Sequence, residues 1–160
     1  MSISRRSAGL LPFRLRGAAL ELLIAHMGGP FWARRDEGAW SIIKGEYDER
    51  EDPYAAALRE FQEETGAPPP SGPALALGEL RQRSGKRIAA WAVEGEFDVS
   101  RLASNTFELE WPRGSGRVRE FPEIDRAAWF DCDTARRKLV PGQVPFVDAL
   151  AQRLSERALP

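Results

Sequence analysis

The chain has 160 residues, of which 42% are hydrophobic and 29% are charged, as in ordinary globular proteins. Its 23 basic and 24 acidic residues give a net charge of -1, which argues against a surface that coats nucleic acid and against a polybasic membrane patch. This length fits one domain, residues 1–160, whose core needs no disulfide or structural metal.

The chain contains a single cysteine, Cys132, for which we expect a buried, small-side-chain role. One cysteine cannot form an internal disulfide, which favours a reducing compartment. No run reaches the roughly 18–20 apolar residues of a membrane helix. Arg14, Arg16 and Glu21 interrupt the N-terminal apolar stretch, which argues against a signal peptide. We therefore expect a cytoplasmic protein with no membrane partner.

The first predicted elements are two apolar strands, over 7–15 and 20–27. A loop rich in glycine and aromatic residues follows over 28–40, and a short strand is expected over 40–43. This strand would deliver the chain to the next element, a helix.

A helix over 53–65 is marked at both ends. Asp52 suits the N-cap and Pro53 the first helical position. Gly66 suits the C-terminal cap, and the three prolines at 68–70 prevent continuation. These signals define the helix boundaries.

The second half of the chain predicts further strands over 75–83, 86–97, 106–111, 117–121 and 127–130, followed by helices over 134–139 and 145–159. Most of these strands are joined as antiparallel hairpins. The order indicates an α/β protein with a mixed sheet covered by helices on both faces.

Three carboxylates share one face of the helix over 53–65. Glu60, Glu63 and Glu64 fall within an arc of about 100°. Like charges at this spacing repel each other, and hard divalent cations prefer oxygen ligands. Arg59 lies beside them and can brace Glu51 in a bidentate pair. Taken alone, these glutamates are equally consistent with a solvated acidic helix face.

A longer pattern surrounds the carboxylates. Gly45 is followed by five residues and Glu51, then by seven residues and the run Arg59-Glu-Phe-Gln-Glu-Glu-Thr-Gly66-Ala67. This stretch, 45–67, resembles the box of the Nudix hydrolases at every defined position. The resemblance implies the Nudix fold, an α/β/α sandwich with a mixed β-sheet.

The resemblance also implies a metal site. Mg²⁺ or Mn²⁺ would bind to Glu60, Glu63 and Glu64 with the help of the Lys44 carbonyl. Glu51 would lie near the metals, oriented by Arg59. We expect Gly45 to permit a tight turn, because glycine tolerates backbone geometry that other residues do not.

The implied activity is hydrolysis of a diphosphate linkage in a nucleoside polyphosphate, either a triphosphate or a dinucleoside polyphosphate, by attack of a metal-activated water. The general base differs among family members. Glu63 is the default candidate on the helix. Glu120 and Glu123 are the candidates in the later loop, Glu123 ahead because Pro122 can fix its direction; a solvated acidic loop is the alternative.

The loop over 28–40 is the candidate substrate lip. Its aromatic residues Phe31, Trp32 and Trp40 can stack on a base, and Arg34 and Arg35 can grip phosphates. Alternatively, the tryptophans close the core and the arginines are solvated.

The segment from Trp40 to Gly45 resembles the entry to the box in dinucleoside polyphosphate hydrolases. Ile43 replaces the usual proline, and Lys44 remains available to contact a polyphosphate.

Two other functions stay open. A non-catalytic Nudix-fold module that binds or senses a nucleotide is the first, although such modules usually lose box glutamates and this chain keeps them. RNA cap hydrolysis would need a basic track, which the balanced charge disfavours. We therefore expect a small-molecule nucleotide as partner and no nucleic acid. The oligomeric state is open, a homodimer included, and His26 is expected to pack rather than to catalyse.

Overall fold

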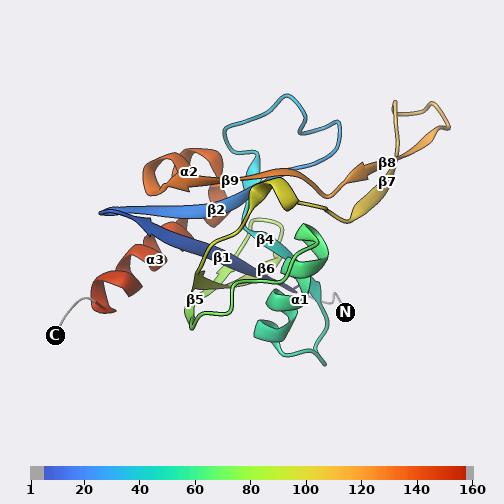
Figure 1. Ribbon diagram of the computed structural model, residues 1–160. Helices are drawn as coiled ribbons and strands as arrows, with labels where there is room; N and C mark the ends of the chain where they lie inside the picture. Colours follow the sequence, from blue (N-terminus) through green and yellow to red (C-terminus); the bar gives the residue numbers. More distant parts are fainter. Residues whose placement is uncertain (1–5, 158–160) are drawn as a thin grey trace.

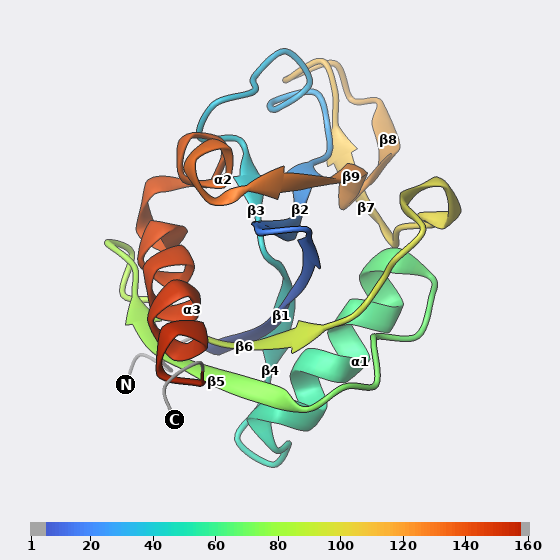
Figure 2. The same ribbon diagram turned by 60° about the vertical axis from the view of Figure 1, so that its left-hand side comes forward.

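The computed structural model describes residues 6–157, in which nine strands and three helices form three layers. A seven-stranded sheet separates helix α1 from helices α2 and α3 (Figures 1 and 2). The predicted α/β/α sandwich is confirmed. The sheet consists of β1 (Arg6–Arg16), β2 (Ala19–Met27), β3 (Trp40–Ser41), β4 (Ile43–Tyr47), β5 (Ala74–Arg81), β6 (Arg87–Glu94) and β9 (Ile124–Asp131).

The remaining elements flank this sheet. A separate hairpin of β7 (Thr106–Glu110) and β8 (Val118–Pro122) projects from the body of the molecule (Figure 1). The helices are α1 (Pro53–Thr65), α2 (Cys132–Lys138) and α3 (Val144–Arg157), with short 3₁₀ turns at Val99–Arg101 and Pro141–Gln143. Within residues 6–157, no helix has the length and apolar character needed to cross a membrane.

Strand β1 organises the sheet. It pairs with β6 in parallel along one edge. Along the other edge its first half pairs with β4 and its second half with β2, both antiparallel. Strand β9 continues the sheet beyond β2. Strand β4, which precedes α1, therefore lies beside β1 at the centre of the sheet.

Both faces of the central strands are buried, and successive side chains enter different cores. Leu22 and Ile24 of β2 pack with α2 and α3, whereas Leu23 and Ala25 pack with α1. A sheet covered by helices on both faces needs such continuous apolar strands. For this reason the apolar runs at the start of the chain correctly predicted strands β1 and β2.

Helix α1 has the predicted boundaries. The Asp52 side chain accepts a hydrogen bond from the Ala55 N–H at 3.0 Å, which caps the first turn. Gly66 takes a left-handed conformation, φ 75°, and its N–H donates to the Gln62 carbonyl at 2.8 Å. The helix buries Ala57 and Phe61 against the sheet and leaves Glu63 exposed.

The strand expected over 40–43 differs in its extent, because the structure divides this segment between β3 and β4. The chain leaves β2 after β3 and joins β1 as β4, which continues to Tyr47. Between the two strands, the Ile42 N–H donates to the Gln143 side chain at 2.8 Å. A side chain from a distant part of the sequence thus satisfies the backbone where the strand changes partner.

Two further boundaries, the starts of β9 and α2, differ from the sequence prediction. Strand β9 begins at Ile124, earlier than expected, because it pairs with β2 along most of its length. Helix α2 begins at Cys132, which is half-buried, because Asp131 accepts from the Thr134 N–H at 2.7 Å and caps it. The predicted end of α3 at 158–159 lies outside the described residues.

Candidate functional site

Helix α1 packs across β1 and β4, so the box helix lies directly on the strand that precedes it. A Cβ atom added to Gly45 would stand 1.8 Å from the Glu60 Oε2 atom. The Glu60 carboxylate therefore fills the place of the missing side chain, where it is 7% exposed. Gly45 belongs to β4, opposite Ala8, and does not have a positive φ. The expected tight turn is wrong; glycine is needed here for space.

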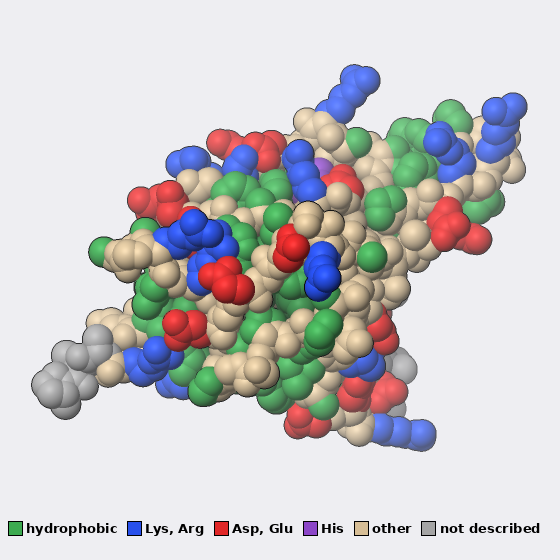
Figure 3. All heavy atoms as spheres, in the orientation of Figure 1, with side chains coloured by type: hydrophobic (Ala, Val, Ile, Leu, Met, Phe, Trp, Pro, Cys, Tyr) green, Lys and Arg blue, Asp and Glu red, His purple; other side chains and the backbone are tan. Residues whose placement is uncertain are grey.

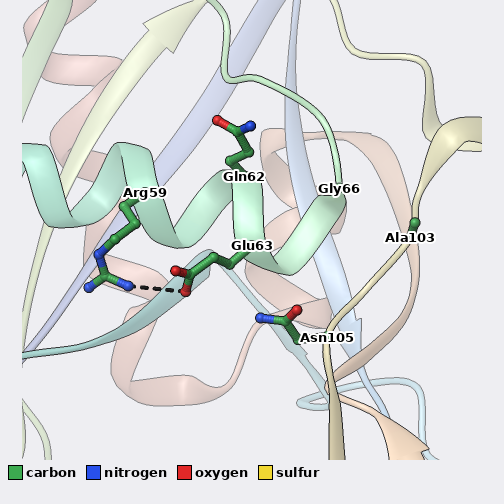
Figure 4. A pocket seen from close by; sticks show the side chains of 6 residues that line it. All are labelled: Arg59, Gln62, Glu63, Gly66, Ala103 and Asn105. Carbon is green, nitrogen blue, oxygen red and sulfur yellow. Dashed lines mark hydrogen bonds and ion pairs between the residues drawn. The ribbon is translucent and has the colours of Figure 1, made fainter.

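Arg59 joins three glutamates. Its Nε and Nη2 atoms donate to the two Glu51 carboxylate oxygens at 2.7 and 2.8 Å, which is the bidentate pair expected from the sequence. Its Nη1 atom donates to Glu60 at 2.9 Å and to Glu63 at 3.0 Å; Figure 4 shows the contact with Glu63. The Arg59 hydrogen bonds lower the pKa of Glu51, and the carboxylates raise the pKa of Arg59. The Arg59 guanidinium thus connects the loop before α1, through Glu51, to two glutamates of the helix.

Glu64 shares its surroundings with Glu123 and Lys44. Burial raises the pKa of Glu64 to about 7, and the negative charges of Glu123 and Glu60 add to the effect. Burial lowers the pKa of Lys44, against the opposing influence of the carboxylates of Glu46, Glu64 and Glu123. The fold therefore gathers a carboxylate from the helix, one from the later loop and a lysine from β4.

The two later-loop candidates lie in different places. Glu123 joins β8 to β9; its N–H donates to the Asn105 carbonyl at 2.7 Å, and its own carbonyl accepts from the Gly28 N–H at 2.9 Å. Glu120 lies on the hairpin opposite Glu108 and accepts a hydrogen bond from the Thr106 hydroxyl. The structure brings Glu123 to the carboxylate cluster and leaves Glu120 outside it.

The donor set fits a hard divalent cation. Within residues 6–157, no three Asp, Glu, His or Cys side chains converge as preformed metal ligands. Glu60 and Glu63 instead converge on one cationic nitrogen of Arg59, with Glu64 one residue further along the same helix. Oxygen ligands of this kind are those that Mg²⁺ and Mn²⁺ select. Two carboxylates facing one positive charge are the observation that supports the fit.

A pocket of about 570 Å³ adjoins the cluster, a volume typical of small-molecule sites. Figure 4 shows the Glu63 and Asn105 side chains on the same side of the helix, whereas Gln62 points away from Glu63. The pocket is lined by Arg59, Gln62, Glu63, Gly66, Ala103 and Asn105. Polar groups therefore border an opening beside the carboxylates.

The loop before β3 places some of the predicted substrate residues at the surface. Phe31 is 60% exposed, and the Arg35 guanidinium lies 4.6 Å from the centre of its ring. Arg34 is exposed and Trp32 is half-buried. Trp40 does not take the open position that we expected. It is 3% exposed and its Nε1–H donates to Asp36 at 2.9 Å, so its ring supports the loop from inside.

Sequence reasoning missed how this loop is held. His26 is packed and hydrogen-bonded, as expected, but its partners were not foreseen. Its Nδ1 atom lies 2.9 Å from the Asp125 carboxylate and its Nε2 atom 2.6 Å from the Arg35 carbonyl. It ties the loop to the start of β9, two residues after Glu123. Nothing in the sequence links positions so far apart.

Most of the chain matches a protein family. A family model described as the NUDIX domain matches residues 4–150. A curated relative, the RNA pyrophosphohydrolase of Rhodospirillum rubrum, is 32% identical over 163 residues, which cover 96% of this chain and 94% of the relative.

Solved structures show the same fold at lower identity. The Ap4A hydrolase of C. elegans, solved as a binary complex, has a TM-score of 0.64 and 17% identity and covers 94% of this chain and 98% of its own. The NUDIX domain of Shewanella oneidensis NrtR, in complex with ADP ribose, has a TM-score of 0.64 and 15% identity and covers 96% and 90%.

Proposed function

The chain belongs to the Nudix family, and from this membership we propose that it cleaves a diphosphate linkage in a nucleoside polyphosphate, a triphosphate or a dinucleoside polyphosphate. As a Nudix pyrophosphohydrolase it would use a divalent metal ion, as Nudix hydrolases generally do. One observation carries the proposal: Arg59 holds the box glutamates together beside a pocket that Glu63 lines, and Glu123 lies near Glu64.

The carboxylates of Glu60, Glu63 and Glu64 would hold Mg²⁺ or Mn²⁺, with the Lys44 carbonyl contributing from β4. The bound cation would neutralise charge on the diphosphate and lower the pKa of a coordinated water. Arg59 keeps Glu51, Glu60 and Glu63 in position, since one guanidinium contacts all three carboxylates.

The proton of the attacking water needs an acceptor. Glu63 and Glu123 are the two candidates that the geometry favours, because both border the cluster whereas Glu120 lies on the hairpin. The Lys44 ammonium, which interacts with the Glu64 carboxylate, would contact a phosphate oxygen. Phe31 and Arg35 would meet the base of the nucleotide.

A substrate panel tests the proposal. Product release from nucleoside triphosphates and dinucleoside polyphosphates would be measured with Mg²⁺ and with Mn²⁺ for the wild type, Glu63→Gln and Glu64→Gln. We expect each variant to lose activity on the order of 100-fold, because a ligand carboxylate is lost. Glu79→Gln, an exposed glutamate on β5, serves as control. Full activity in both box variants would remove the catalytic assignment, and nucleotide binding without turnover would favour a non-catalytic module.

A terminal polyphosphate on RNA is a second candidate substrate. It is favoured by the relative named RNA pyrophosphohydrolase, which matches nearly the full length of this chain. RNA contains a diphosphate linkage only at a phosphorylated terminus, so the same carboxylate site would act on that end. Pyrophosphate or phosphate release from a short RNA with a 5′-triphosphate, compared with a free triphosphate, distinguishes the two.

A further inference from the structure

The hairpin of β7 and β8 has two chemically different faces. Directly opposed residues of an antiparallel pair share a face. Glu108 lies opposite Glu120, so one face is acidic, and Glu110 extends it. The other face alternates with the first and carries aromatic and arginine side chains: Phe107, Leu109, Trp111, Arg117, Arg119 and Phe121.

Contacts between side chains confirm this aromatic–arginine face. The rings of Phe107 and Phe121 are 6.0 Å apart, and the Arg119 guanidinium lies 5.5 Å from the Phe121 ring. Leu109 is 36% exposed and Arg119 is exposed. Figure 3 shows hydrophobic and basic side chains together along one edge of the projecting hairpin and acidic side chains along the other. The positive charge is thus separated from the hairpin's own carboxylates.

The aromatic–arginine face begins at the candidate site. The base of the hairpin is closed by the Glu123 N–H, which donates to the Asn105 carbonyl at 2.7 Å, and Asn105 lines the pocket beside Glu63. On the other side, a Cβ atom added to Gly29 would lie 2.8 Å from the Phe107 ring. The face therefore extends from the pocket and from the loop that carries Phe31.

We infer that the aromatic–arginine face binds a second nucleotide unit of the substrate, beyond the unit whose diphosphate is cleaved. This inference rests on the proposed function. The base of the second unit packs against the aromatic side chains, and its phosphate contacts Arg117 and Arg119. Stacking of bases on aromatic rings, together with arginine on the backbone, is how sequence-tolerant nucleotide sites are built. The second unit is either the other nucleoside of a dinucleoside polyphosphate or the next nucleotide of an RNA end.

Binding measurements with matched ligands test the inference. Isothermal titration in Mg²⁺ compares three nonhydrolysable ligands: a nucleoside triphosphate, a dinucleoside tetraphosphate, and a short RNA with a 5′-triphosphate. We expect the wild type to bind at least one two-unit ligand about 10-fold more tightly than the triphosphate. The double variant Arg117→Ala/Arg119→Ala should lose that preference and bind the triphosphate within about two-fold of the wild type.

The control is Arg153→Ala/Arg157→Ala, which removes the same charge from exposed positions of α3 and should keep the preference. The two-unit ligand that shows the preference identifies its source. Equal affinity of the wild type for all three ligands, or a preference that survives in the hairpin variant, would overturn the inference. Triphosphate hydrolysis measured on the same preparations is independent of the hairpin: binding through Arg117 and Arg119 without hydrolysis contradicts only the proposed function.

Discussion

The box region, residues 45–67, and the loop–hairpin region, residues 28–39 with 104–125, are assembled in different ways. In the box, Arg59 contacts glutamates one, four and eight positions away in the chain. The loop–hairpin region is held by distant partners: His26, at the end of β2, contacts Asp125, 99 positions away, and the Gly28 N–H donates to the Glu123 carbonyl. Local spacing therefore encodes the proposed catalytic residues, whereas the proposed substrate contacts depend on tertiary packing. Substitutions in the box should accordingly lower turnover, and substitutions that affect the loop–hairpin region should weaken substrate affinity.

The largest effect is expected from Arg59→Ala. Without the guanidinium, Glu51, Glu60 and Glu63 repel each other and lose their positions. A displacement of about 1 Å in a catalytic group can cost on the order of 100-fold in rate, so we expect kcat to fall by that order on every substrate. Arg59→Lys should not restore it, because lysine cannot make the bidentate contact. Steady-state kinetics check this. An unchanged kcat in Arg59→Ala would show that the Arg59 contacts with the three glutamates are not needed for turnover.

Gly45→Ala should destabilise the box itself. The new methyl group would overlap the Glu60 carboxylate, which must move. Such overpacking costs about 1–3 kcal/mol of unfolding free energy, and the displaced carboxylate should lower turnover as well. Gly142→Ala, whose Cβ would meet only Gln82 at 3.8 Å, is the matched control with an expected change near zero. Denaturant unfolding measures both; equal stability of the two variants would contradict the close packing.

His26→Leu tests the loop–hairpin region. It removes the hydrogen bond that His26 makes with the Arg35 carbonyl and releases the loop from Asp125. We expect a loss of about 1 kcal/mol in unfolding free energy and a several-fold increase in KM with kcat nearly unchanged. Unfolding curves and a separate determination of kcat and KM check this. A fall in kcat with unchanged KM would place His26 with the chemistry instead.

The smallest expected effect concerns pH and metal. The pKa of Glu64 is raised from 4.5 to about 7 in the folded chain. A carboxyl group with a higher folded than unfolded pKa stabilises the fold at low pH, and this contribution is lost as the pH rises from about 4.5 through 7. A bound cation offsets that loss. Mg²⁺ should therefore raise the melting temperature more at pH 8 than at pH 6, and Glu64→Gln should remove the difference. An equal Mg²⁺ shift at both pH values in the wild type would contradict this account.

The features that could be predicted from the sequence lie mainly in the box, where the contacts are local. The caps at Asp52 and Gly66 and the spacing of the glutamates are local signals, and they predict α1 and the Arg59–Glu51 pair correctly. The alternating burial of the central strands follows from continuous apolar runs. The layered fold was therefore predictable, whereas the strand ends were less so.

The remaining features depend on partners that spacing does not reveal. The chain changes strands at Ile42 because Gln143, about a hundred residues later, accepts its N–H. Trp40 is buried because its Nε1–H donates to Asp36 and its ring packs edge-on against His26 and Phe130. Glu123 rather than Glu120 reaches the cluster because the chain turns between β8 and β9. Each of these facts requires the tertiary structure.

We propose that the box helix is a metal-dependent site for diphosphate cleavage. A metal-restoration assay tests this claim: the hydrolysis rate of one nucleoside polyphosphate that the wild type cleaves is followed as Mg²⁺ is restored to chelator-treated protein, for the wild type and Glu63→Gln/Glu64→Gln. We predict no hydrolysis without the cation, recovery in the wild type, and a rate at least about 100-fold lower in the double variant. A rate that is independent of Mg²⁺, or equal in both proteins, would contradict the claim.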